Sequence, residues 1–273
     1  MKLSPVTRRG NKNRLIHETG FISFFPRFNH RLFYIEPFAG TCEVALHYLD
    51  QARTMYNVTL NDSDGELINF WKVLAQHPVE FEERVKPVFL GITLDENDDI
   101  DRAINFWARS QRSVHLSMAI RPRKHFDQLV SILNRHKVIF TQHEWKKSLE
   151  VALKLNPREE MVFYLDPPYF NTDAGRRPGP AGSADLEGYG NLDHDEMAAF
   201  LNGIKDDSRI WIFLSHHDCE FIRAAYDGWH FMELKMMGDS GRAHLKRPRM
   251  ELLISNRSFM RWGDQALDNF VGG

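Results

Sequence analysis

The sequence has little cysteine and no long apolar run. Cys42 and Cys219 are the only cysteines among 273 residues, and so few thiols are typical of a reducing compartment, where they pack as small apolar side chains and not as a disulfide. No segment reaches the roughly 18 to 20 apolar residues of a membrane helix, and no apolar signal-peptide core follows the charged residues 1–14. We therefore expect a soluble, cytoplasmic protein without redox chemistry.

A net basic charge is also missing. The formal net charge is −2 and the pI is near 6.7, unlike a protein that binds nucleic acid through charge alone. The basic residues nevertheless gather locally while most acidic residues lie elsewhere, so we expect one basic face; the alternative for each patch is ordinary solvated charge. The patches are Arg8, Arg9, Lys12 and Arg14; Arg109, Arg112, Arg121, Arg123 and Lys124; Arg176 and Arg177; and Arg242, Lys246, Arg247 and Arg249.

Short apolar runs recur along the chain, in which 42% of residues are hydrophobic. Five runs end in polar or turn residues and lead into helix-like sequence, which predicts a parallel sheet covered on both faces. Residues 231–236 and 250–254 predict two antiparallel strands at a sheet edge. The expected fold class is α/β and Rossmann-like, with a mixed, mostly parallel sheet. The five runs are residues 33–38, 58–60, 138–140, 161–165 and 210–214.

Residues 76–137 break this alternation. They are polar and rich in arginine and aromatic residues, and they contain no apolar run typical of a buried strand. We therefore predict a catalytic domain formed by residues 1–75 and 138–273, with residues 76–137 as an inserted helical lobe. Residues 171–191 are rich in Gly, Pro and Asp, which predicts a flexible loop after the fourth run.

Candidate ligand residues follow the first two runs, because ligands of open α/β sheets bind beyond the carboxyl ends of the strands. The first turn brings backbone close to a ligand, and Asp62 after the second run is placed to accept hydrogen bonds from a ribose diol. The phosphate-binding G-x-G-x-x-G pattern is missing, which favours a nucleoside such as S-adenosylmethionine over a dinucleotide. The alternative is an ordinary turn with an N-capping aspartate. The first turn contains Glu36, Pro37, Phe38, Ala39, Gly40 and Thr41.

The tetrapeptide Asp166-Pro167-Pro168-Tyr169 directly follows the run 161–165. Consecutive prolines fix φ and remove backbone donors, which makes a rigid turn whose carbonyls are available to a ligand. The Asp166 carboxylate and the Pro167 carbonyl can accept hydrogen bonds from one amino group, while the Tyr169 ring offers a stacking surface. The pattern therefore indicates a site for a planar amine.

An adenine amino nitrogen is a poor nucleophile, because its lone pair is delocalised into the ring. Two acceptors favour a pyramidal nitrogen, and in-line alignment with a sulfonium methyl lowers the barrier further. A base in a duplex must be flipped out to reach such a pocket. This chemistry needs no metal, and we interpret His216-His217-Asp218-Cys219 as a turn whose adjacent residues do not converge on an ion. Ser215 is expected to cap the following helix.

These motifs resemble the Dam-type, D12-class DNA adenine N6-methyltransferases over most of the chain. The resemblance implies that Gly10, Asn11 and Lys12, within residues 7–15, approach the methionine part of S-adenosylmethionine, and that Asp166 lies beside this cofactor. Residues 35–41 match the family's first cofactor loop, although Cys42 stands where a second glycine is common. Asp62 matches the ribose position. Glu144 and Trp145, within residues 141–148, match the motif that contacts the cofactor's adenine, and the implied catalytic residues are Asp166, Pro167, Pro168 and Tyr169.

The resemblance implies a class I methyltransferase fold and a site-specific, adenine-specific DNA methyltransferase. The expected cofactor is S-adenosyl-L-methionine and the expected partner is double-stranded DNA, with no metal and no membrane, in a monomer or weak dimer of a bacterial or phage-infected cell. An RNA adenine methyltransferase and a silent cofactor-binding module are the alternatives. The recognition sequence stays open, as does the choice between epigenetic marking, restriction-modification and evasion of phage defence. Candidate nucleic-acid contacts are Arg109, Arg112, Arg121, Arg123, Lys124, Arg176, Arg177, Tyr189, Lys246 and Arg247.

Overall fold

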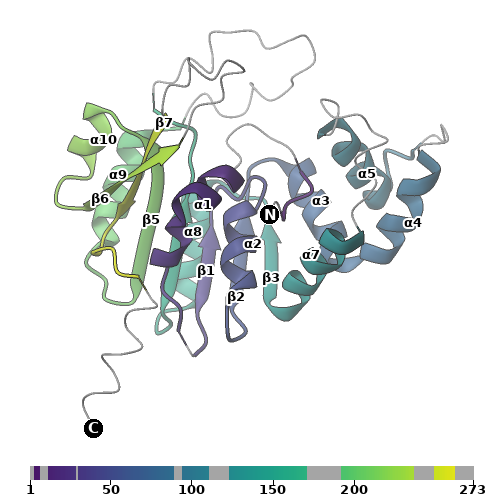
Figure 1. Ribbon diagram of the computed structural model, residues 1–273, viewed down its shortest axis with the longest axis horizontal. Helices are drawn as coiled ribbons and strands as arrows, with labels where there is room; N and C mark the ends of the chain where they lie inside the picture. The colour runs from purple at the N-terminus through teal and green to yellow at the C-terminus, as the bar shows by residue number, and fades with distance from the viewer. Residues whose placement is uncertain are drawn as a thin grey trace. The chain divides into compact units, whose positions relative to one another are not determined.

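A computed structural model describes most of the chain (Figure 1). It covers residues 3–6, 12–28, 30–88, 94–110, 123–170, 192–236 and 249–261, of which 86–88, 123–125, 236 and 249 are described by their backbone only. The chain divides into two compact units. The first unit contains residues 1–13 and 28–155, and the second contains residues 14–27 and 156–273.

The first unit is built on three parallel strands in the order β3-β2-β1. Phe33 pairs with Asn57, which pairs in turn with Lys137, so the three strands begin level and their carboxyl ends lie at one edge. Strand β1 is buried from Tyr34 to Glu36, which agrees with a strand covered on both faces. The strands are β1 (Phe33–Glu36), β2 (Asn57–Asn61) and β3 (Lys137–Thr141).

The helices of the first unit include those of the predicted insertion. An aromatic cluster holds three of them together: the Phe70 ring lies 5.9 Å from Phe81 and 5.7 Å from Phe106, and the Phe81 ring lies 6.2 Å from Trp107. Figure 1 shows α4 and α5 beside α3. The separate role predicted for residues 76–137 stays a prediction. The helices are α2 (Glu43–Asp50), α3 (Gly65–Gln76), α4 (Pro78–Val88), α5 (Asp99–Ser110), α7 (Arg123–Arg135) and α8 (Trp145–Leu155).

The second unit contains four strands in the order β4-β5-β7-β6. Strand β4 is parallel to β5, whereas β7 is antiparallel to both β5 and β6. The Phe25 ring stacks on Phe213 of β5 at 4.3 Å, and Asn202 joins the two helices beside the sheet through the Ala225 carbonyl. The elements are η1 (Phe21–Phe24), β4 (Met161–Leu165), α9 (His194–Ile204), β5 (Ile210–His217), α10 (Glu220–Ala225), β6 (His230–Met236) and β7 (Arg249–Ser255); α1 (Asn13–Thr19) begins at the last residue of the first unit's N-terminal segment.

Within the described residues, the seven strands confirm the predicted fold class, a mixed and mostly parallel Rossmann-like arrangement with helices. Strand β4 has the predicted bounds, and the two C-terminal strands pair antiparallel as expected. One prediction is wrong: Ser215 does not cap a helix, because pairing with β7 extends β5 to His217 and Cys219 stands at the N-cap of α10. Among the described residues, no helix has the length and hydropathy needed to cross a membrane.

Candidate active site

The turns that follow β1, β2 and β3 are joined by one buried side chain, Asn61. Its Nδ2 donates to the carbonyls of Pro37 (3.0 Å) and His143 (2.9 Å). Its Oδ1 accepts from the Thr141 hydroxyl and the His143 N–H, both at 2.9 Å. Asn61 has no solvent-exposed surface, and these contacts use both donors and both lone pairs of its amide. It therefore fixes the predicted cofactor side of the first unit, a role that the sequence did not reveal.

Asp62 lies at the same edge and forms a hydrogen bond with the predicted glycine turn. Its Oδ2 accepts from the Gly40 N–H at 2.9 Å, and its Oδ1 accepts from the Asp64 N–H at 3.0 Å. The N-cap of α3 is Asp64, whose carboxylate accepts from Glu66 and Leu67. The alternative interpretation of Asp62 as a helix cap is therefore wrong. Asp62 is 3% exposed, so its carboxylate is not a surface charge.

The remaining predicted cofactor residues of this unit lie around the same turns. The Phe38 and Trp145 rings stack with centroids 6.4 Å apart, which joins the β1 and β3 turns. Glu36 is buried and accepts a hydrogen bond from Tyr34, and Thr41 is buried. Glu144 is exposed. The geometry thus combines Phe38, Trp145 and Asp62 at one sheet edge.

Cys42 has a backbone conformation that usually favours glycine. Its φ is 53°, in the left-handed region, and Gly40 has φ 49°. A residue with a Cβ is strained there by roughly 1–2 kcal/mol, so the backbone keeps a glycine-like path without the glycine. Burial, and then the charges of Glu36 and Asp62, raise the pKa of the Cys42 thiol, which therefore stays protonated at neutral pH.

We expect Cys42→Gly to change the free energy of unfolding by less than about 1 kcal/mol, because relief of the left-handed strain offsets loss of a small buried side chain. Cys42→Val should destabilise the protein by about 2 kcal/mol or more, since a β-branched residue is strained further at positive φ. Urea unfolding measures both values. Equal destabilisation by the two variants would contradict the assigned backbone conformation.

The N-terminal segment is attached to α2 through Glu43. The Glu43 carboxylate accepts from the Leu3 and Ser4 N–H groups at 2.9 and 3.0 Å, and from Asn13 Nδ2 at 2.6 Å. Burial raises the pKa of Glu43, but hydrogen bonds from His47, Leu3, Asn13 and Ser4 outweigh burial and leave it lowered. Glu43 thus holds the chain before and after the predicted Gly-Asn-Lys motif. Of that motif, Lys12 is buried, whereas Gly10 and Asn11 lie outside the described residues.

In the second unit, the predicted catalytic tetrapeptide follows β4 as expected. Ser215 of β5 donates to Asp166 Oδ1 at 2.8 Å. The Tyr164 hydroxyl lies 3.0 Å from the Ser215 oxygen, and it must donate there, because the single hydroxyl proton of Ser215 is directed at the carboxylate. Ser215 is fully buried and Tyr164 is 2% exposed. A buried chain of hydroxyl groups therefore orients Asp166, which adds Ser215 to the candidate site.

The rest of the tetrapeptide is held by neighbouring side chains. The Pro168 carbonyl accepts a hydrogen bond from His194, whose pKa is lowered by burial. The Tyr169 hydroxyl donates to Glu251 Oε2 at 2.8 Å. The backbone N–H of Phe170 donates to His216 Nε2 at 2.9 Å. Long-range contacts thus fix a turn that the sequence identified by its residue types alone.

Three potential metal ligands lie at the end of β5 and at the start of α10. One ligand atom from each of His216, His217 and Cys219 lies within 4.8 Å of the others, so the prediction that these side chains do not converge is wrong. His216 Nε2 accepts the Phe170 N–H, so its proton is on Nδ1, which lies 3.0 Å from the His217 carbonyl. Because both nitrogens of His216 have partners within the protein, we assign no metal to this cluster.

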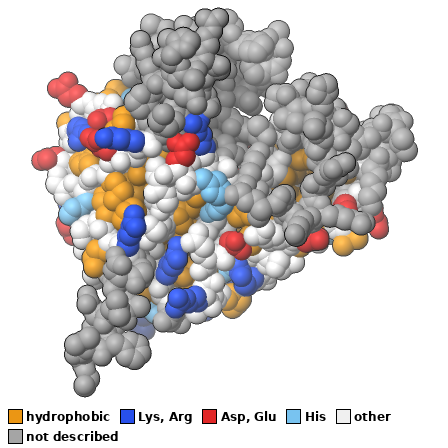
Figure 2. Space-filling view, viewed as in Figure 1, with side chains coloured by type: hydrophobic (Ala, Val, Ile, Leu, Met, Phe, Trp, Pro, Cys, Tyr) orange, Lys and Arg blue, Asp and Glu red, His pale blue; other side chains and the backbone are white. Residues whose placement is uncertain are grey.

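Most of the predicted nucleic-acid contacts lie outside the described residues. Arg109 is exposed in the last turn of α5, and Arg123 and Lys124 begin α7 with undescribed side chains. On the face drawn in Figure 2, the coloured Lys and Arg side chains are separated by apolar, acidic and uncharged ones. The basic face stays a prediction. The residues outside the description are Arg112, Arg121, Arg176, Arg177, Tyr189, Lys246 and Arg247.

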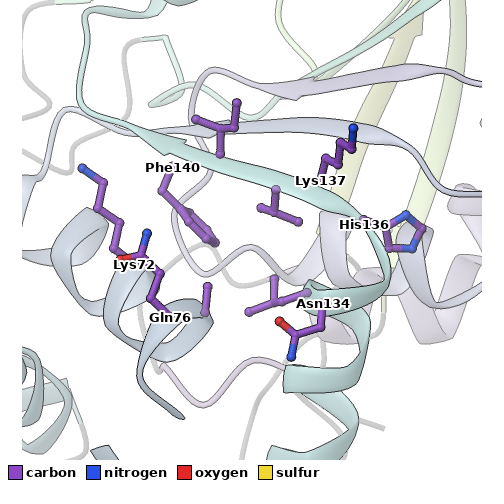
Figure 3. A pocket seen from close by; sticks show the side chains of 10 residues that line it. Lys72, Gln76, Asn134, His136, Lys137 and Phe140 are labelled. Atoms are coloured by element: carbon purple, nitrogen blue, oxygen red, sulfur yellow. The ribbon is translucent and has the colours of Figure 1, made fainter.

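A cavity of about 480 Å³ lies within the first unit. Figure 3 shows Lys72 and Gln76 of α3 opposite Lys137 and Phe140 of β3. None of the predicted site residues lines this cavity. The His136 imidazole that borders it is bound to the Tyr56 N–H and the Leu49 carbonyl, so we assign the cavity no part in catalysis.

The strand order, with β7 antiparallel to its neighbours, defines a Rossmann-like α/β fold. Residues 9–110 match the family model described as "D12 class N6 adenine-specific DNA methyltransferase". The chain is also 22% identical, over 275 residues covering 90% of each chain, to a DNA adenine methylase from Haemophilus influenzae. These two matches agree with the predicted resemblance to the Dam-type family.

Solved structures of more distant methyltransferases also resemble the chain. The rRNA methyltransferase aviRa from Streptomyces viridochromogenes aligns with a TM-score of 0.40 and 12% identity, over 91% of this chain and 94% of its own. The human methyltransferase 10 domain containing protein aligns with a TM-score of 0.35 and 12% identity, over 89% and 82%. At these scores the two likenesses add nothing to the functional assignment.

Proposed function

We propose that this chain is a site-specific DNA adenine N6-methyltransferase that uses S-adenosylmethionine and acts on a flipped adenine. The family match and the DNA adenine methylase relative support adenine in DNA as the substrate. The observation that carries the mechanism is Asp166, a carboxylate oriented by Ser215 at the start of a turn with two prolines. It supplies the acceptor that an adenine amino group requires.

The residues of the first unit fit an adenosine-containing cofactor. Asp62 is a buried carboxylate at the end of β2, and a carboxylate is the group that a ribose diol donates to. Phe38 and Trp145 offer apolar ring surface for a nucleobase. When bound, S-adenosylmethionine supplies an activated methyl group. Asn61 holds the turns that carry these side chains, so they are oriented before binding.

In the second unit, Asp166 and the Pro167 carbonyl accept the two N–H bonds of the target amine. This contact draws the nitrogen toward a pyramidal geometry and directs its lone pair at the methyl group. The carboxylate also stabilises the positive charge that develops on nitrogen, and one of its oxygens can accept the released proton. Tyr169 is proposed to stack on the base.

Transfer of labelled methyl groups from S-adenosylmethionine to unmethylated duplex DNA tests this function. We expect the label in DNA and not in RNA of the same sequence. Transfer to RNA alone would favour an RNA methyltransferase, and cofactor binding without transfer to either polymer would favour a silent binding module. Sequencing the methylated adenines in DNA of an expressing host would then give the recognition sequence.

A further inference from the structure

The Tyr169 hydroxyl forms a hydrogen bond with strand β7, which contributes no other residue to the proposed reaction. Its hydroxyl donates to Glu251 Oε2 at 2.8 Å, and Glu251 lies in β7. Glu251 pairs in register with His217, near the carboxyl end of β5. This contact therefore joins the outer antiparallel part of the second unit to the catalytic turn.

The Tyr169 ring also packs against two histidine rings. Its centroid lies 4.8 Å from that of His216 and 5.6 Å from that of His217, with tilted planes. His216 is fully buried and binds the Phe170 N–H, directly after Tyr169. The hydrogen bond from Phe170 to His216 thus fixes the backbone next to Tyr169. Rotation of the phenol about its side-chain torsions is limited by the hydrogen bond at its far end.

A carboxylate is unexpected at this place in the sequence. Glu251 precedes Leu252, Leu253 and Ile254, none of which has exposed surface. A partly buried carboxylate is costly unless it accepts hydrogen bonds, and the Tyr169 phenol supplies one. A glutamate would repel DNA phosphates, so a direct contact with the DNA backbone does not explain it.

We propose that Glu251 is a positioning residue: by accepting the Tyr169 hydroxyl proton, it fixes the plane of the ring on which the target base stacks. The inference rests on the proposed function, because it assigns a purpose to Tyr169 in base binding. In this role Glu251 acts through its hydrogen bond to the tyrosine. The arrangement sets the amine against Asp166, since a tilted base would move its amino group away from the carboxylate.

The test compares Glu251→Ala, Glu251→Gln, Tyr169→Phe and the double variant Tyr169→Phe/Glu251→Ala in labelled methyl transfer to unmethylated duplex DNA. Glu251→Ala and Tyr169→Phe should each lower kcat by roughly 10- to 100-fold, as expected for a misaligned reactant. Glu251→Gln should stay within about threefold of the parent, because its amide oxygen still accepts the phenol proton. The double variant should be no slower than the slower single variant, since each single substitution already removes the hydrogen bond between residues 169 and 251.

Glu233→Ala is the matched control. Glu233 lies in the neighbouring strand β6, its side chain is 53% exposed and its ion pair is with Arg223, so we expect full kcat. S-adenosylmethionine affinity should stay within about twofold in every variant. Full kcat in Glu251→Ala, or multiplied losses in the double variant, would overturn the inference. A parent protein that methylates no nucleic acid would instead refute the proposed function.

Discussion

Replacing Asp166 by alanine should lower methyl transfer by about 1,000-fold or more while S-adenosylmethionine affinity stays within about tenfold. The carboxylate contributes mainly in the transition state, where positive charge develops on the amine nitrogen, so its loss lowers kcat and not ground-state binding. Single-turnover rates with labelled cofactor and equilibrium binding of the cofactor measure the two quantities separately.

Three further variants show whether the effect belongs to the carboxylate. Asp166→Asn should also be nearly inactive, because a neutral amide neither stabilises the positive charge that develops on the amine nor accepts the released proton. Ser215→Ala removes the group that orients Oδ1 but leaves the charge, so a loss of only about tenfold is expected. Asp62→Ala should do the reverse of Asp166→Ala and weaken the cofactor first. If Asp166→Ala lost cofactor binding to the same extent as turnover, Asp166 would have a structural role.

The largest loss of stability is expected from Asn61→Ala, which should lower the free energy of unfolding by roughly 3–4 kcal/mol. The substitution leaves two carbonyls, one N–H group and one hydroxyl without their partner in a buried place, each at a cost of about 1 kcal/mol or more. Urea unfolding followed by circular dichroism measures this difference.

Asn57→Ala is the matched control for this prediction. Asn57 lies at the other end of β2 and is also buried, but its Nδ2 has no hydrogen-bond partner within the described part of the chain. The substitution should cost less than about 1 kcal/mol, because no side-chain hydrogen bond of that nitrogen is lost. Equal destabilisation by Asn57→Ala and Asn61→Ala would show that burial alone, and not the hydrogen bonds, makes Asn61 important.

Much of the fold was predictable, because local patterns determine it. Strand β4 is an uninterrupted apolar run with the predicted bounds, and its five residues are all buried. Such runs are typical of strands covered on both faces. The end of β5 was not predictable in this way, since Ser215, His216 and His217 are polar. Pairing with β7, far along the chain, keeps them in the strand.

The candidate site was predictable where one motif carries the chemistry. Asp166 and Asp62 were identified because polar residues at strand ends bind ligands in α/β folds. Asn61, Glu43 and Glu251 were missed, because each acts on partners far away in the sequence. A polar residue inside or beside an apolar run is the one signal that could have indicated Asn61 and Glu251, since buried polar groups need partners.

Cys42 shows a further limit of motif reading. Cys42 stands where the resembling family commonly has a glycine, yet its backbone has the left-handed conformation that favours glycine. A sequence pattern shows which residue adopts a backbone conformation with the least strain, whereas the surrounding contacts determine the conformation itself. Here the Gly40 N–H bound to Asp62 and the Ala39 N–H bound to the Asn61 carbonyl hold the turn.

The position of the transferred methyl group is the most direct test of an amine held by Asp166. Unmethylated duplex DNA is incubated with the purified protein and S-adenosylmethionine, digested to nucleosides and analysed by mass spectrometry. We predict N6-methyl-2′-deoxyadenosine from the parent protein and none from Asp166→Ala. Methylation at a ring nitrogen or carbon, or equal product from the variant, would contradict the proposed chemistry.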